Sequence, residues 1–224
     1  MSDTSIAILN KLNLVLLAGV SGSGRNTIID GLIKLGGYHY IVSDTTREPR
    51  VNNGIKEQNG DRYWFKSETE FLRDLKCGMY LEAEIIHNQQ VSGISLRELQ
   101  KALDDNKIAI TDIELGGFRN ILGLKPDTIG VIVLPPSFDE WLRRLTKRGR
   151  MKDDEIKNRL KSGCRLFAQA ITATSNISIV VNDNIETVIT EIDMLAQGKI
   201  VNNTLTNKRL AKDLLRFTKE YLSR

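Results

Sequence analysis

The stretch GVSGSGRNT, residues 19–27, is where the residue types of this sequence most directly suggest chemistry. Glycines at 19, 22 and 24 let successive backbone N–H groups turn towards a phosphate chain, because glycine tolerates conformations that other residues avoid. A helix beginning directly after the loop would direct its positive end to the same place. Arg25 adds a cation for the outer phosphates. The pattern therefore predicts a nucleotide-binding loop.

Two positions in this loop depart from the usual phosphate-binding pattern, in which lysine is followed by serine or threonine. Arg25 carries its charge on a planar fork that is bulkier than an ammonium group. Asn26 stands where a hydroxyl would bind Mg²⁺, and its amide oxygen can coordinate the ion directly or through water. The loop therefore predicts nucleotide binding more strongly than it predicts turnover.

A second anion site is predicted in the stretch IVSDTTREPR, residues 41–50. Arg47 and Arg50 lie three residues apart beside two threonine hydroxyls, and Ser43 is a further polar group. Guanidinium forks bind phosphate oxygens through paired, charge-assisted hydrogen bonds. A surface turn with solvated arginines is the alternative, but it is less favoured in a chain that also carries a phosphate-binding loop.

These two sites need a scaffold, and the hydrophobic pattern indicates alternating strands and helices. Leu14–Ala18 is a short apolar run bounded by glycine, which is typical of a parallel strand buried on both faces. Further strands are expected at residues 39–43, 62–65, 108–113, 129–134 and 177–182. Helices are expected at residues 26–36, 67–78, 95–106, 138–149, 153–163 and 185–198. The alternation predicts a three-layer α/β domain around a mostly parallel sheet.

The end of the chain has the pattern of one more helix. Leu210, Leu214, Phe217 and Tyr221 fall on one face, and lysines and arginines occupy the other. Most helices of this kind pack on their own domain. An oligomerisation helix or a helix for anionic surfaces is the alternative.

Composition excludes several classes of protein. A chain of 224 residues can bury a core without disulfides or metal sites, and Cys77 and Cys164 lack a partner at ligand spacing. The 32 basic and 28 acidic residues are well mixed, so the charge does not predict a nucleic-acid partner. The apolar run before the loop is too short for a membrane span or a signal, so we expect a cytoplasmic protein without a membrane partner.

In their order along the chain, the motifs resemble those of the guanylate kinase family. The family's loop reads like GPSGAGKST and its acceptor stretch like VSxTTRxPR, which Gly19–Thr27 and Val42–Arg50 match. Later pieces follow in the expected order, namely GDRYWF, GMYLEAE, TDIELGG, LPPSFDEWLRRL, RGR, NRL and VVND. The resemblance extends from about Leu14 to Gly198. It implies a three-layer P-loop kinase fold with a mostly parallel sheet, a small NMP-binding subdomain and a lid.

The resemblance also implies a division of the chain. Residues 1–198 would form the guanylate kinase-like domain, with the NMP-binding subdomain at about 43–96 and the lid at about 144–165. Residues 199–224 would form a C-terminal basic amphipathic helical extension, and the protein would be a monomer or a homodimer.

For the acceptor nucleotide, the resemblance implies recognition of GMP. The implied substrate-binding residues are Ser43, Arg47, Arg50, Tyr63, Glu82 and Glu114. The two acids would face the guanine edge, whose N1–H and exocyclic amine are donors that adenine does not present in that pattern. The arginines and the tyrosine would hold the acceptor phosphate.

For the donor, the resemblance implies ATP and Mg²⁺. The implied ATP-binding residues are Gly19, Ser21, Gly22, Ser23, Gly24, Arg25, Asn26, Thr27 and Asn182. Asn26 and Asp112 would hold the metal. Arg25, Arg148 and Arg159 would be catalytic, with Arg144 as a companion, because cations neutralise charge on the transferring group and raise the rate roughly 10³-fold or more.

The chain departs from the family at further ligand positions. Residues 51–62 are longer than the usual spacing by about four residues. The stretch HNQQVSG replaces the usual GNYYGTS, so the second phosphate-binding tyrosine is replaced, with Gln90, Val91 and Ser92 as candidates for its place. Glu114 stands for an aspartate and Gly116 for a glutamine.

Three hypotheses follow. The leading one is an ATP-dependent nucleoside monophosphate kinase that acts on GMP or dGMP by in-line transfer, with closure of two flexible segments. The alternative is a binding module that keeps the pocket for a nucleotide or a phosphorylated partner but has lost catalysis, which Arg25 and Asn26 motivate. The third keeps the reaction but changes the acceptor.

Overall fold

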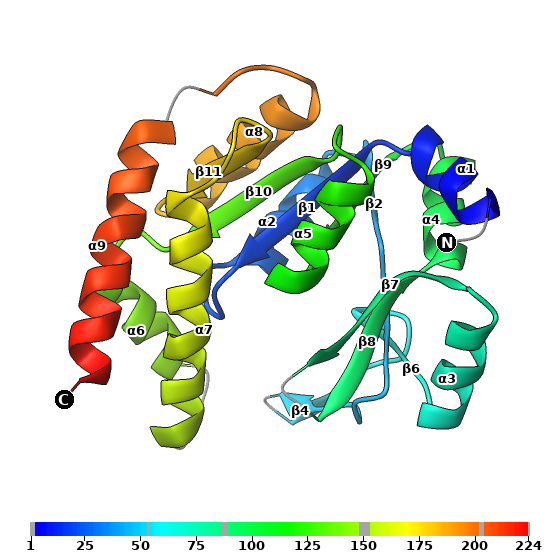
Figure 1. The fold of residues 1–224 in the computed structure, drawn as a ribbon, viewed down its shortest axis with the longest axis horizontal. Coiled ribbons are helices and arrows are strands. Elements are labelled where there is room, and N and C mark those ends of the chain that lie inside the picture. Colours follow the sequence, from blue (N-terminus) through cyan, green and yellow to red (C-terminus); the bar gives the residue numbers. More distant parts are fainter. Residues whose placement is uncertain (1–2, 53, 87–88, 148–152, 202–203, 224) are drawn as a thin grey trace.

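The computed structural model describes residues 3–52, 54–86, 89–147, 153–201 and 204–223 (Figure 1). Its centre is a five-stranded parallel sheet with the order β11-β10-β1-β9-β2. The strands are β1 (Leu14–Gly19), β2 (Tyr38–Tyr40), β9 (Ile108–Asp112), β10 (Ile129–Leu134) and β11 (Ile177–Val181). Most of them are continuous apolar runs, as expected for parallel strands that are covered on both faces.

Helices cover both faces of this sheet, which confirms the predicted three-layer α/β architecture. Side chains alternate along β1, so Leu16 enters one core cluster while Val15 and Leu17 enter the other. Helices α2 (Arg25–Lys34) and α8 (Ile185–Ala196) pack on the second cluster. The helices on the first cluster include α1 (Asp3–Lys11), α4 (Leu96–Asp104), α5 (Leu115–Leu124), α6 (Phe138–Thr146) and α7 (Asp153–Ile171).

A smaller, four-stranded sheet lies at the lower right of Figure 1 and has the order β6-β3-β8-β7. Its strands are β3 (Ser43–Thr45), β6 (Tyr63–Phe65), β7 (Tyr80–Ile86) and β8 (Gln90–Ser95). Strand β3 is parallel to β6 and antiparallel to β8, and α3 (Glu68–Lys76) packs on β7. Strands β4 (Val51–Asn52) and β5 (Ile55–Lys56) form a separate two-stranded hairpin.

Some elements differ from those expected from sequence. The pattern does not indicate β7 and β8, because carboxylates and polar residues interrupt their apolar alternation. Helices α1 and α5 are also additional, and the first turn of α5 contains two glycines that disfavour a helix when the sequence is considered alone. The strand expected at residues 39–43 is divided between β2 and β3, which belong to different sheets.

The C-terminal helix α9 (Thr204–Leu222) packs on α7, β11 and α6, as most helices with its pattern do. Ala211 and Leu214 are buried in the first core cluster, and Nδ2 of Asn207 donates to the carbonyl oxygen of Ile179 at 2.6 Å. Phe217 is 40% exposed and lies beside the ring of Phe138. Among the described helices, none combines the length and hydropathy that a membrane crossing requires.

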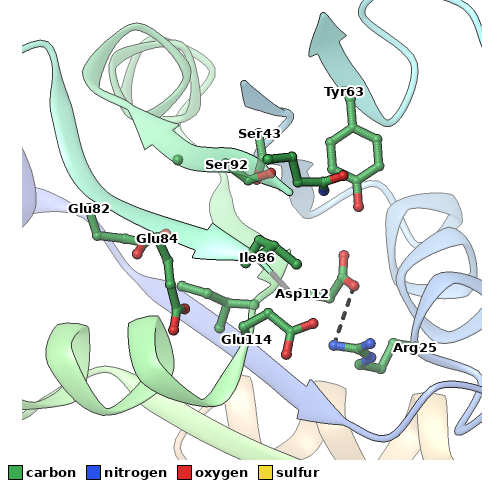
Figure 2. A pocket seen from close by; sticks show the side chains of 12 residues that line it. Arg25, Ser43, Tyr63, Glu82, Glu84, Ile86, Ser92, Asp112 and Glu114 are labelled. Carbon is green, nitrogen blue, oxygen red and sulfur yellow. Dashed lines mark ion pairs between the residues drawn. The ribbon is translucent and has the colours of Figure 1, made fainter. Parts of the chain in front are cut away.

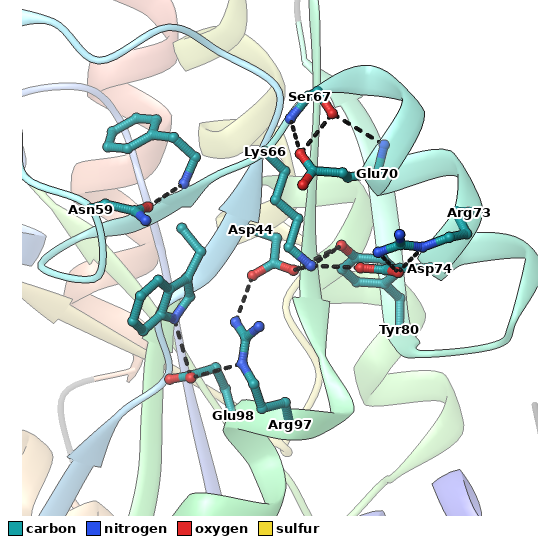
Figure 3. A network of polar contacts seen from close by, with 12 residues as sticks. Asp44, Asn59, Lys66, Ser67, Glu70, Arg73, Asp74, Tyr80, Arg97 and Glu98 are labelled. Carbon is teal, nitrogen blue, oxygen red and sulfur yellow. Dashed lines mark hydrogen bonds and ion pairs between the residues drawn. The ribbon is translucent and has the colours of Figure 1, made fainter.

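A buried polar network ties the small sheet to the rest of the molecule (Figure 3). Asp44 on β3 is fully buried and accepts a hydrogen bond from Oη of Tyr80 on β7 at 2.8 Å. The same carboxylate pairs with Nζ of Lys66 at 2.7 Å and with Nη2 of Arg97 on α4 at 2.9 Å. Burial opposes the charge of Lys66, but its hydrogen bonds to Asp44 and Asp74 raise its pKa. One carboxylate therefore joins β3, β7 and α4.

Replacing Asp44 with alanine is expected to lower the free energy of unfolding by about 3 kcal/mol, because the remaining cations lose a buried counter-charge. Urea unfolding followed by circular dichroism measures the loss. Asp74→Ala is the matched control, since Asp74 pairs with the same lysine at 2.7 Å but is more exposed. Its loss should cost less than about 1 kcal/mol. Equal effects of the two substitutions would contradict this account.

Candidate active site

A pocket is lined by residues from both sheets and from the first turn of α2 (Figure 2). Its lining residues are Arg25, Ser43, Tyr63, Glu82, Glu84, Ile86, Gln90, Ser92, Gly93, Asp112, Ile113 and Glu114. Six of these residues were predicted from the sequence to belong to different sites, and the structure brings them together. They are Arg25 of the loop, Asp112 of the metal site, and the acceptor-site residues Ser43, Tyr63, Glu82 and Glu114.

Strand geometry explains why these side chains meet. Asp112 ends β9 and is in register with Leu17 of β1, close to the start of the loop, because carboxyl ends of parallel strands share one edge of the sheet. Side chains alternate along β7, so Glu82 and Glu84 lie on the same face of that strand. Ser92 of β8 is paired with Glu84, which continues this wall of the pocket.

Three carboxylates line one side of the pocket, and we call Glu82, Glu84 and Glu114 the acid wall. Burial, and next the charge of Glu84, raise the pKa of Glu82 to about 7. Glu84 was not among the site residues predicted from the sequence. The E-A-E spacing within a strand was the available signal, since it places both acids on one face.

Two glycines at the start of α5 make room for the acids. A Cβ at Gly116 would lie 2.2 Å from Oε1 of Glu84, and one at Gly117 would lie 2.8 Å from Oε2 of Glu82. The backbone N–H of Gly117 also donates to Oε2 of Glu84 at 3.2 Å. A side chain at position 116 would therefore have to displace the carboxylate of Glu84 from this position.

The loop between β1 and α2 is held from two sides. Gly22 and Gly24 have φ of 87° and 92°, in the region that favours glycine. Nδ2 of Asn182 donates to the carbonyl oxygen of Ser23 at 2.7 Å, and Nε1 of Trp141 donates to that of Ser21 at 2.9 Å. The amide nitrogen of Asn182, predicted to contact ATP, is thus used to support the loop.

The cation of the loop reaches into the pocket. Nη1 of Arg25 lies 3.5 Å from Oδ2 of Asp112, and the two side chains are only 16% and 21% exposed (Figure 2). Asn26 and Thr27 are exposed on the first turn of α2. Within the described part of the chain, no cluster of three or more His, Cys, Asp or Glu could hold a metal. Mg²⁺ usually keeps several waters and uses few protein ligands, so an exposed amide with one carboxylate fits it.

Arginines of α6 and α7 approach the loop from the other side. Nη1 of Arg159 donates to Oγ of Ser21 at 2.9 Å, while its Nη2 pairs with Glu155. Nη1 of Arg144 donates to the carbonyl oxygen of Asn182 at 3.1 Å. Arg148, the other predicted catalytic arginine, lies outside the described residues.

The family model that matches the chain is described as guanylate kinase and covers residues 11–198. This chain belongs to the guanylate kinase family. The guanylate kinases of Corynebacterium glutamicum and Mycoplasmoides gallisepticum are 31% and 33% identical to it over 188 residues each. These alignments cover 83% and 81% of this chain, and 95% and 90% of the relatives.

A solved structure shows the same fold. The crystal structure of guanylate kinase from Anaplasma phagocytophilum matches with a TM-score of 0.63 and 23% identity. The match covers 84% of this chain and 85% of that one. The parallel sheet with helices on both faces is therefore the architecture of this family.

The family's second tyrosine has no aromatic replacement in the pocket. Of the three candidates, Gln90 and Ser92 line the pocket, while Val91 pairs through its backbone with the hydroxyls of Thr45 and Thr46. Oγ of Ser92 donates to Oγ1 of Thr45 at 2.9 Å. Alternation along β8 explains this outcome, because the side chains of Gln90 and Ser92 lie on one face of the strand and that of Val91 lies on the other.

Arg47 and Arg50, the predicted phosphate clamp, are not among the residues that line the pocket. The guanidinium carbon of Arg47 lies 5.0 Å from the centroid of the Tyr63 ring, so Arg47 packs over that ring. Arg50 is exposed. Arg47 and Arg50 are thus the predicted acceptor-site residues that lie outside the pocket in this conformation of the guanylate kinase family member.

Proposed function

We propose that this protein transfers the γ-phosphoryl group of ATP to GMP or dGMP. The observation that carries the proposal is the contact between Arg25 of the loop and Asp112 at 3.5 Å, in a pocket that also holds the acid wall. A phosphate chain on the loop would therefore end beside a nucleotide bound in that pocket. Membership of the guanylate kinase family supports the same reaction.

The acid wall supports guanine as the base of the acceptor. Guanine presents N1–H and its 2-amino group as donors on one edge, and carboxylate oxygens are acceptors. Adenine does not offer this pair of donors, so its binding would leave a buried carboxylate without a partner. Glu82 and Glu84, which share one face of β7, line the pocket together with Glu114, so all three acids are candidates to make this distinction.

The donor side would be organised by the loop and the arginines around it. Backbone N–H groups at the start of α2 would bind the phosphate oxygens, and Arg25 and Arg159 would offset the charge that develops during transfer. Mg²⁺, when bound, supplies charge neutralisation on the phosphate oxygens, and Asn26 and Asp112 would hold it directly or through water. Closure of the small sheet would bring Arg47 and Arg50 to the acceptor phosphate.

The same contact between Arg25 and Asp112 also bears on the alternative of a module that binds nucleotides without turnover. The guanidinium of Arg25 is paired with Asp112, so it must leave this partner, or share it, to reach a phosphate. The retained Arg159 beside the loop supports the kinase, since a pure binding module has no evident use for a cation at that place.

The deciding experiment is a coupled ADP-release assay with ATP, Mg²⁺ and GMP, in parallel with calorimetric titration of GMP. Turnover with GMP, and far less with AMP, UMP and CMP, is the expected result. Measurable GMP binding without ADP release would favour the binding module. Turnover with another monophosphate in preference to GMP would instead show a changed acceptor.

The affinity for guanosine is expected to rise about tenfold or more between about pH 5.5 and pH 8. The pKa of Glu82 is about 7 in the free protein, so the carboxyl is protonated at the lower pH and cannot accept from both guanine donors. Loss of the proton as the pH rises restores the acceptor. Guanosine is the better probe, since the phosphate of GMP titrates in the same range.

Two variants test this assignment. Glu82→Gln should remove the pH dependence, and Glu84→Gln should move its midpoint to lower pH, because the charge of Glu84 contributes to the raised pKa. Titration calorimetry across the range measures both effects. A midpoint that Glu82→Gln leaves unchanged would assign the titration to another group.

A further inference from the structure

The phosphate clamp contains a carboxylate to which neither the sequence motifs nor the family resemblance assigns a role. Glu57 directly follows β5, the second strand of the hairpin in the lengthened segment. Its Oε2 accepts from Nη1 of Arg47 at 2.7 Å and from the backbone N–H of Arg50 at 2.8 Å. One carboxylate oxygen therefore contacts both residues of the clamp.

The hairpin returns the chain to the clamp. Val51 pairs with Lys56, and Asn52 pairs with Ile55, so strands β4 and β5 lie side by side. The backbone N–H of Glu57 then donates to the carbonyl oxygen of Arg50 at 2.8 Å. Although the segment after Arg50 is longer than usual, the hairpin leaves Glu57 next to Arg47 and Arg50.

The guanidinium of Arg47 is held on one edge. Its side chain is 9% exposed and lies over the rings of Tyr63 and Phe65, at 5.0 and 5.4 Å from their centroids. Nη1 donates to Glu57 and also to the carbonyl oxygen of Glu48 at 2.8 Å. Across the described ranges, all side-chain hydrogen bonds of Arg47 are made by Nη1, which leaves Nε and Nη2 for a ligand.

The Glu57 carboxylate is held in its charged form. Burial alone would raise the pKa of Glu57, but hydrogen bonds from the Arg47 side chain and the Arg50 backbone outweigh it and lower the pKa. The contact with Arg47 is therefore a charge-assisted hydrogen bond at neutral pH, stronger and more directional than one between neutral groups.

We propose that Glu57 is a positioning residue for the acceptor phosphate: it holds the Nη1 edge of Arg47 beside Tyr63, so that the remaining edge of the guanidinium meets the phosphate. This inference rests on the function proposed above. It differs from a role as a stand-in for the phosphate, because Glu57 occupies a single nitrogen of Arg47 and, at Arg50, only the backbone.

The test compares Glu57→Gln with Glu48→Gln. Both substitutions remove one negative charge near Arg47, but Glu48 contacts that residue only through its backbone carbonyl. The measurements are KM for GMP and ATP, kcat, and calorimetric affinities for GMP and guanosine. We expect Glu57→Gln to raise KM and Kd for GMP about tenfold, with KM for ATP and Kd for guanosine unchanged. Glu48→Gln should behave like the native protein.

Native affinity for GMP in Glu57→Gln would overturn the proposal. Tighter GMP binding would also overturn it, since Glu57 would then compete with the phosphate, and equal weakening of guanosine would indicate a merely structural role. If Glu57→Gln unfolds below the assay temperature, Glu57→Asp decides, because it keeps the charge but shortens the reach and should still weaken GMP selectively. Failure of the native protein to bind GMP would instead overturn the proposed function itself.

Discussion

Replacing Arg159 with alanine is expected to lower kcat for GMP phosphorylation about 10³-fold, with a much smaller change in KM for either nucleotide. Arg159 projects from α7 to the loop, where its Nη1 lies 2.9 Å from Oγ of Ser21. A cation at this place stabilises the charge that develops on the transferring phosphoryl group more than it stabilises the bound substrates. The loss should therefore appear in turnover.

Steady-state kinetics with GMP as the varied substrate measure this effect. Arg165→Ala is the matched control, because Arg165 is an exposed arginine on the same helix that contacts only Ser162 among the described residues. It should retain native kinetics. A fall in thermal stability that accompanies the loss of activity in Arg159→Ala would point to the packing of α7 in place of catalysis, and a kcat within a few-fold of native would contradict the role.

Replacing Arg25 with alanine is expected to lower kcat/KM about 10²- to 10³-fold. The loop would keep its backbone donors and the N-terminus of α2, so ATP should still bind, although more weakly. The lost cation is the one that links the loop to the acceptor pocket through Asp112. Steady-state kinetics with ATP as the varied substrate measure the loss of kcat/KM, and titration with ATP measures the loss of ATP affinity separately.

Three further variants sharpen this prediction. Arg25→Lys should keep most of the activity, since a compact ammonium serves the same phosphates. The double substitution Arg25→Lys/Asn26→Ser should raise kcat above the native value if the unusual loop costs rate. Lys34→Ala removes an exposed cation at the far end of α2 and should change nothing. Native turnover by Arg25→Ala would show that the backbone of the loop suffices.

Much of the fold could be predicted from the sequence, because the central parallel strands are continuous runs of apolar residues. The run at Leu14–Ala18 is apolar throughout, since each residue is buried in the core cluster on one face of the sheet or the other. Strands β7 and β8 could not be predicted in this way, because they line a polar pocket. Glu82, Glu84 and Ser92 replace the apolar residues that usually reveal a strand.

The candidate site was predicted unevenly for a related reason. The loop at residues 19–27 is contiguous, so its glycines and Arg25 are visible together in the sequence. The contact between Arg25 and Asp112 joins the first residue of α2 to the last residue of β9, and that between Arg47 and Glu57 depends on the hairpin between them. The sequence contains several acids, so the spacing of residues alone cannot identify Asp112 as the partner of Arg25 or Glu57 as the partner of Arg47.

The sequence by itself determined the layered architecture, the glycine-rich loop and the family, because each depends on residues that are close together or repeat with the period of a strand or helix. Only the tertiary structure decided which carboxylates lie together at the candidate site. It placed Glu84 beside Glu82 in the space that Gly116 leaves open, and it brought Glu57 to Arg47. These contacts form when separate helices and strands pack together. The local pattern of residues along the chain does not specify which distant residues will meet.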